Sequence, residues 1–229
     1  MSLALDLIVI ALLAICVFGG FRKGLIMGVA RVLIVVIAVL VAGVVARDYS
    51  PGLAENIEPY VGWLSEDAVD QVVADAEVPV DQATGDQAYG IIRDSFLGMG
   101  ISQDTAESLA AKAQEIMDTT TANLRKSISK VFTEVLTYVL IFIIIFAIVA
   151  ALLLILVNIV TNAFTLPGFA LVDKIAGSCL GLVYGLCILF VVCWLLRYCG
   201  VFLPKELLED TILVKFFMNF NPLQALLGL

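Results

Sequence analysis

The chain has 229 residues, of which 62% are apolar and 15% are charged, and its mean hydropathy is +1.06. Soluble domains are about 45–50% apolar and about 25% charged, so this composition excludes a soluble enzyme, a disordered chain and a secreted disulfide scaffold. The net charge of −8 argues against nucleic acid as a partner. The chain has no histidine, which excludes histidine-based catalysis and metal sites. We therefore expect an integral membrane protein that is not an enzyme and that holds no cofactor and no metal.

Four apolar stretches predict an all-α, polytopic membrane protein. A helix of about 20 residues crosses the hydrocarbon layer of about 30 Å, and each stretch is long enough or nearly so. We expect two transmembrane helices in residues 1–46 and two more in residues 131–199. The stretches themselves are residues 3–20, 24–46, 135–172 and 175–196.

Residues 47–130 separate the two pairs of predicted spans and have a different character. From Asp48 to Asp118 there are 15 acidic residues, and only Arg93 and Lys112 are basic. Ser65 and Ser102 are typical helix starts, because a serine hydroxyl caps free backbone amides. The segment is predicted to be an acidic helical insert, with a loosely ordered acidic loop as the alternative.

The C-terminal segment, residues 200–229, predicts an amphipathic helix rather than a fifth span. Leu208, Ile212, Phe216 and Phe220 recur at helical spacing. Such an aromatic stretch is typical of a helix that lies at the membrane interface. Packing of this helix against the bundle is the alternative.

Basic residues in short loops favour the cytoplasmic side of a membrane. Arg22, Lys23 and Lys174 fall on one face under the four-span prediction, and this face is assigned to the cytoplasm. Both termini and the acidic insert are then extracytoplasmic. Five other basic residues favour the opposite orientation: Arg47, Lys130, Arg197, Lys205 and Lys215.

The five cysteines lie in or at the ends of apolar runs and form no CxxC pair. Buried cysteine behaves as a small hydrophobic residue, so we expect no redox or metal role for them. They are Cys16, Cys179, Cys187, Cys193 and Cys199.

Glycines at four-residue spacing predict close helix packing. Gly177, Gly181 and Gly185 line one face of the last span, and Gly24 and Gly28 form a shorter version on the second span. Small residues let helix backbones approach in lipid, where association has no hydrophobic driving force. Chance spacing is the alternative, and the pattern leaves open whether the contact is within one chain or between subunits.

Arg31 lies well inside the second span and suggests a polar cluster near the cytoplasmic side. A charge in lipid turns toward polar partners or toward water, so Arg31 is expected to meet Asn158 and Asp173. Snorkelling of the arginine to the headgroups is the alternative. Two further acids, Asp6 and Glu134, are predicted at the membrane edge, where such groups are solvated. Asn162 and Ser178 complete the predicted cluster.

The pattern resembles the bacterial colicin V production protein family. The resemblance is carried by Asp6, by the turn at residues 22–24, by Asn158, by the segment 173–185 and by the aromatic tail helix around residues 216–220. It covers about two-thirds of the chain, outside the insert, which is expected to be an addition to the family pattern. A further departure is Tyr184, where family members can carry a basic residue.

The resemblance implies an inner-membrane protein connected with the production or export of a toxin. The leading prediction is therefore an accessory or scaffold protein for a secreted product, with the lipid bilayer and other export proteins as partners. The alternative is a small transporter or channel subunit that works as a homo-oligomer.

Overall fold

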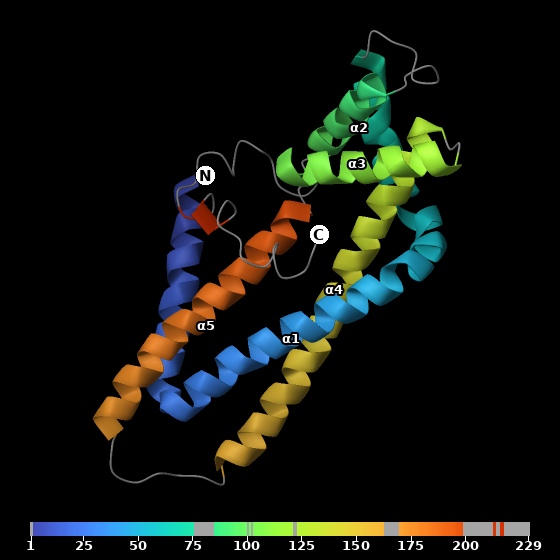
Figure 1. Cartoon of the computed structure of the whole chain (residues 1–229). Helices are drawn as coiled ribbons and strands as arrows, with labels where there is room; N and C mark the ends of the chain where they lie inside the picture. Colours follow the sequence, from blue (N-terminus) through green and yellow to red (C-terminus); the bar gives the residue numbers. More distant parts are fainter. Residues whose placement is uncertain are drawn as a thin grey trace. The chain divides into compact units, whose positions relative to one another are not determined.

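A computed structural model of the chain describes residues 2–75, 85–99, 101, 103–120, 123–162, 170–198, 213 and 216–217. The regular elements in these ranges are all helices, as the sequence predicts (Figure 1). They are α1 (Ser2–Asp75), α2 (Asp86–Gly98), α3 (Gln103–Thr120), α4 (Leu124–Asn162) and α5 (Ala170–Tyr198).

Three of these helices, α1, α4 and α5, are long and apolar enough to cross a membrane. The predicted fourth span falls in α5, and the predicted first and second spans both fall in α1. Residues 135–162 of the predicted third span fall in α4, but its residues 170–172 belong to α5, so the predicted end of this span was wrong. Since α1 is interrupted at Gly24, its two segments can be counted separately or together, and the number four stays a prediction. The 39 residues of α4 extend about 58 Å at 1.5 Å per residue, well beyond the hydrocarbon layer.

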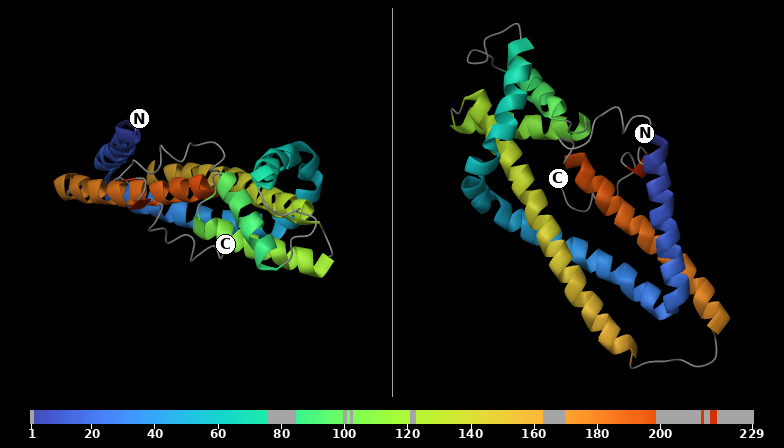
Figure 2. Two further views of the ribbon diagram at one scale, coloured as in Figure 1. Left: turned by 90° about the horizontal axis from the view of Figure 1, so that it is seen from above. Right: turned by 180° about the vertical axis from the view of Figure 1, so that it is seen from behind.

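The chain divides into two compact units. The first, the membrane unit, comprises Met1–Ala46, Phe142–Leu195 and Glu206–Leu229. The second, the insert unit, comprises Arg47–Ile141 and Leu196–Lys205. Both α1 and α4 contribute to both units, and Figure 2 shows these long helices from two other sides.

The membrane unit buries a small apolar core and exposes long rows of aliphatic side chains. On α4, Ile144, Leu152 and Ile159 are more than half exposed, as expected for residues that face lipid. The indole of Trp194 packs on Phe142 with ring centroids 4.9 Å apart. A second cluster buries Val9, Leu189, Cys193 and Phe217.

The predicted interfacial tail contributes to that second cluster. Phe217 is buried and meets the ring of Phe190 edge-on, with centroids 5.2 Å apart, whereas Phe216 is exposed. Leu213 is partly buried against the same cluster. Of these three tail residues, Phe216 points outward, whereas Phe217 and Leu213 pack on the membrane unit. The rest of the predicted tail helix lies outside the described residues.

In the insert unit, α2 and α3 form a helical hairpin. Ile92 and Phe96 of α2 are fully buried, as are Ala106 and Ala110 of α3. The Tyr89 hydroxyl donates to the carbonyl of Glu107 at 3.3 Å and ties the two helices together. The buried residues Ala106, Leu109, Ala110 and Ala113 recur at helical spacing and form an apolar face of α3.

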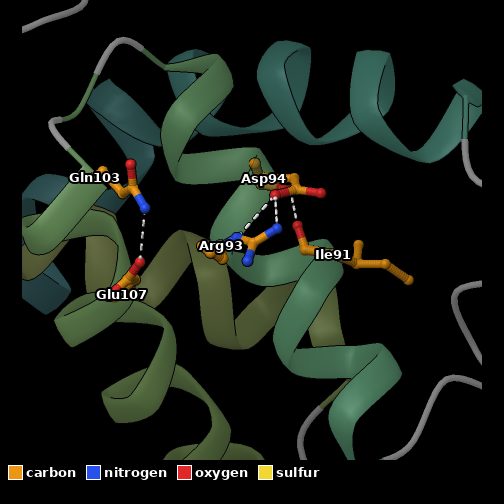
Figure 3. Close-up of polar contacts among 6 residues, drawn as sticks. Ile91, Arg93, Asp94, Gln103 and Glu107 are labelled. Carbon is orange, nitrogen blue, oxygen red and sulfur yellow. Dashed lines mark hydrogen bonds and ion pairs between the residues drawn. The ribbon is translucent and has the colours of Figure 1, made fainter.

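The outer surface of this hairpin carries short-range polar contacts (Figure 3). Arg93 donates to the Asp94 carboxylate from two nitrogens, at 2.8 and 3.0 Å. The hydrogen bond and the charge of Asp94 together raise the pKa of the Arg93 guanidinium. Gln103 donates to Glu107 one turn further along α3, at 3.1 Å. Such exposed pairs contribute little to stability.

The insert differs from its prediction at two places. No helix begins at Ser65, because α1 continues through this residue to Asp75. Pro51 and Pro59 lie inside the same helix, although proline usually ends or bends one. The sequence pattern also missed α2, whose Gly90 disfavours helix.

Candidate functional site

The membrane unit is organised around the break in α1 at Gly24. This residue has φ 77° and ψ −178°, a backbone region that is essentially restricted to glycine. The break leaves the first amides of the following helical segment, residues 25–75, without partners inside their own helix. A helix start within the apolar part of a chain must find acceptors elsewhere.

Asp173, in the first turns of α5, supplies such an acceptor. Its Oδ1 accepts a hydrogen bond from the backbone N–H of Leu25 at 2.9 Å. A carboxylate at this position caps the helical segment and also suits the positive end of its dipole. A Cβ at Gly24 would run into the Asp173 carboxylate, so the capping group and the glycine occupy one tightly filled place.

The glycines of α5 lie against the first segment of α1, residues 2–23. A Cβ built at Gly181 would lie 3.2 Å from the Cα of Gly20 and closer still to the carbonyl oxygen of Cys16. A Cβ at Gly177 would lie 2.8 Å from the carbonyl carbon of Gly24. One at Gly185 would lie 3.1 Å from the Cβ of Cys16. Gly177 and Gly181 meet backbone atoms and have room for hydrogen only, whereas Gly185 meets side chains that would have to shift slightly. Whether the three glycines hold the helices together stays a prediction.

Gly28 and Gly20 extend the same contact. A Cβ at Gly28 would lie 2.8 Å from the Cβ of Leu180. Sequence reasoning missed Gly20, where a Cβ would lie 2.9 Å from the Cα of Gly181. The signal that could have found it is the spacing of Gly20, Gly24 and Gly28, which continues the four-residue period across the turn.

The side chain of Arg31, from the second segment of α1, lies near both the first segment of α1 and α5. Its guanidinium carbon is 5.8 Å from the centre of the Tyr184 ring, a cation–π distance. Its Nη1 is 3.5 Å from the place a Cβ would take on Gly19. The predicted cluster therefore has an aromatic member that the sequence did not indicate.

The structure gives contacts for two other members of the predicted polar cluster, Asp173 and Ser178. Asp173 holds Leu25, and the Ser178 hydroxyl donates to the carbonyl of Lys174 in its own helix, at 3.1 Å. Asn158 is exposed on α4. The meeting of Arg31 with Asn158 stays a prediction. Asn162 ends α4, and its side chain lies outside the described side chains.

The two acids predicted at the membrane edge each have a protein partner. The Asp6 carboxylate accepts a hydrogen bond from the backbone N–H of Leu213 in the tail, at 3.2 Å. Glu134 forms an ion pair with Lys112 of α3, with Nζ and Oε1 2.8 Å apart. Both groups therefore link segments that are distant in sequence.

The part of the chain described by the structure has no group of three or more carboxylate or thiol side chains that could hold a metal ion. Cys16, Cys179, Cys187 and Cys193 are free thiols, and Cys199 lies outside the described residues. The arrangement is suited to holding helices together and to presenting charge at one end of the bundle.

Comparison with protein families identifies a match over most of the chain. The family model described as Colicin V production protein matches residues 5–76 and 95–222, most of the chain. The match enters the acidic insert from both sides, so the expectation that the whole insert is an addition to the family was wrong: of the insert, only residues 77–94 lie outside the match. No curated protein and no solved structure matches the chain.

Proposed function

Because the chain belongs to the colicin V production protein family, we propose that it is a membrane accessory or scaffold protein that assists the production or export of a secreted toxin or a similar product. The family match over most of the chain is the observation that carries this proposal. The proposed role is not enzymatic, and the lack of histidine removes the commonest general base.

The structure supports a scaffold in two ways. The insert unit buries its own apolar side chains, among them Ile92, Phe96 and Phe132, which suits a body that a partner protein recognises. In the membrane unit, α5 and α1 approach closely at Gly177 and Gly181. Close backbone contacts of this kind favour a fixed frame for partners in the membrane.

We place the insert and both termini outside the cytoplasm in the bacterial inner membrane. The support is the joint position of Arg22, Lys23 and Lys174: the contact of Lys174 with Phe21 brings the basic turn of α1 and the start of α5 to one end. Positive residues on short connections prefer the cytoplasmic side.

Site-specific crosslinking in living cells tests the scaffold proposal. A photoreactive amino acid replaces Gln87 on α2, an exposed position of the insert unit. We expect a crosslink to a component of the export machinery and a loss of secreted product when the gene is deleted. The matched control carries the same amino acid at Leu152, an exposed position of α4 that is expected to contact lipid.

A transporter or channel subunit acting as an oligomer is the second candidate, favoured by Arg31 within an apolar segment. Charges inside a membrane often mark a transport path. Proton or solute flux through liposomes that contain only the purified protein, without a crosslinked partner in cells, would favour transport and contradict the scaffold.

A further inference from the structure

One end of the membrane unit carries a concentration of positive charge. Arg22 and Lys23 lie beside the break of α1, Arg31 lies in the segment after it, and Lys174 lies near the start of α5. We name these four residues the basic cap. Arg22, Lys23 and Lys174 are exposed and Arg31 is half-buried. The chain as a whole carries a net charge of −8, so the basic cap is a positive region on a negatively charged protein.

Aromatic rings support three of the four cations. Arg22 lies over Phe18 with 6.0 Å between the guanidinium carbon and the ring centre. The ammonium of Lys174 lies 5.7 Å from the centre of the Phe21 ring, and Arg31 stacks on Tyr184. A cation above a ring face is held at a defined depth, while its N–H groups stay available to an anion.

Among the described residues, no carboxylate forms an ion pair with a residue of the basic cap, although the Asp173 carboxylate lies beside Gly24 at the break. The ion pairs Arg93–Asp94 and Lys112–Glu134 both lie in the insert unit. The nearest acid in sequence, Asp173, accepts from the Leu25 amide. Residues 163–169, which precede α5, contain no acidic side chain. The exposed cations Arg22, Lys23 and Lys174 are therefore accessible to an anion from outside the chain.

The position of the basic cap, at the ends of apolar helical segments, indicates which anion it would meet. The cap lies at the ends of two apolar helical segments, where lipid headgroups are found, and Arg31 is about 10 Å along the helix from Gly24, within reach of the headgroups for a long side chain. Guanidinium groups match the geometry of phosphate oxygens. Basic residues beside transmembrane helices attract anionic lipids.

We propose that the basic cap binds the phosphate of an anionic phospholipid headgroup. This binding goes beyond the proposed scaffold function and does not depend on it. Lipid phosphate and free phosphate share the same chemistry, and the basic cap is assigned to the lipid because its charges stand at the membrane surface.

Native mass spectrometry of the full-length protein tests the assignment. The protein is released from detergent micelles that contain phosphatidylglycerol and phosphatidylcholine in equal amounts. We expect wild type to retain phosphatidylglycerol preferentially. The triple variant Arg22→Gln/Lys23→Gln/Lys174→Gln leaves Arg31 in place, and its preference should fall by about fivefold for each charge removed.

The matched control removes three exposed charges elsewhere, in Arg47→Gln/Lys126→Gln/Lys130→Gln, and should keep the wild-type preference. Equal losses in the two triple variants, or an unchanged preference in the first, would overturn the proposal. Displacement of phosphatidylglycerol by inorganic phosphate would also overturn it, since the site would then bind free anions.

Lys23→Gln alone serves if the triple variant does not fold, because Lys23 is exposed. Its preference should fall by about fivefold, and an unchanged value contradicts the proposal. The measurement uses pure protein, so its outcome is independent of whether the chain assists export.

Discussion

At the scale of single residues, the backbone conformation of Gly24 and the carboxylate of Asp173 complement each other. The positive φ of Gly24 creates a second helix start inside α1, and the carboxylate of Asp173 satisfies its first amide. The space that a side chain at residue 24 would need is filled by that carboxylate. The Asp173 carboxylate therefore leaves no room for a side chain at residue 24, and the break at Gly24 exposes the amide that donates to this carboxylate.

Gly24→Ala should lower the free energy of unfolding by about 1–3 kcal/mol, the cost of holding a non-glycine residue in this backbone region. Unfolding in mixed detergent micelles, followed by circular dichroism, measures the change. Gly52→Ala is the control, because it has ordinary helical geometry and open space around it; replacing glycine by alanine there should be neutral or stabilising. Equal stability of the two variants would show that the break does not need glycine.

Asp173→Ala should destabilise the protein by about 0.5–2 kcal/mol, as expected for the loss of a helix cap. Asp173→Asn keeps an oxygen that accepts the Leu25 amide and should retain most of the stability. The same micelle titration compares the two. If the asparagine variant is as unstable as the alanine variant, the charge rather than the hydrogen bond explains the effect of Asp173.

At the scale of elements, the contact between α5 and the first segment of α1 depends on the absence of side chains. The four-residue spacing of Gly177, Gly181 and Gly185 predicts a bare face on α5. It does not identify the helix that covers this face, because spacing gives position around one axis and no information on neighbours. Gly20 and Cys16, which approach Gly181, became evident only from the structure.

Gly181→Leu should lower the melting temperature in detergent, with a loss of about 1–3 kcal/mol from overpacking. Leu182→Ala, one position further round the helix, removes an exposed side chain and should have a smaller effect. Wild-type behaviour of Gly181→Leu would mean that the helices separate there without loss and that the packing role is wrong.

At the scale of the whole molecule, composition and apolar runs were sufficient to predict an all-helical membrane protein. Boundaries were less predictable: α4 begins at Leu124, before its apolar run, because its first turns pack in the insert unit, where Ile128 and Val131 are buried. The partners of Arg31 and Asp173 could not be predicted either. Hydropathy gives the depth of a side chain in the membrane but not the helix that it faces.

The predicted orientation can be measured with single cysteines in a version of the chain that lacks the native ones. Asp86→Cys and Lys23→Cys, both at exposed positions, should react oppositely with an impermeant thiol reagent in intact cells. Position 86 should be labelled because the insert is predicted to be extracytoplasmic. Labelling of position 23 and not of position 86 would reverse the orientation.

The hydrogen bond between Asp173 and Leu25 joins residues 148 positions apart. A ribosome that adds about 5–20 residues per second needs about 7–30 s to cover that interval. During this time the first amide after the break in α1 has no carboxylate from α5, and only the arrival of the last helix supplies it. The break in α1 is therefore completed only after most of the chain has been synthesised.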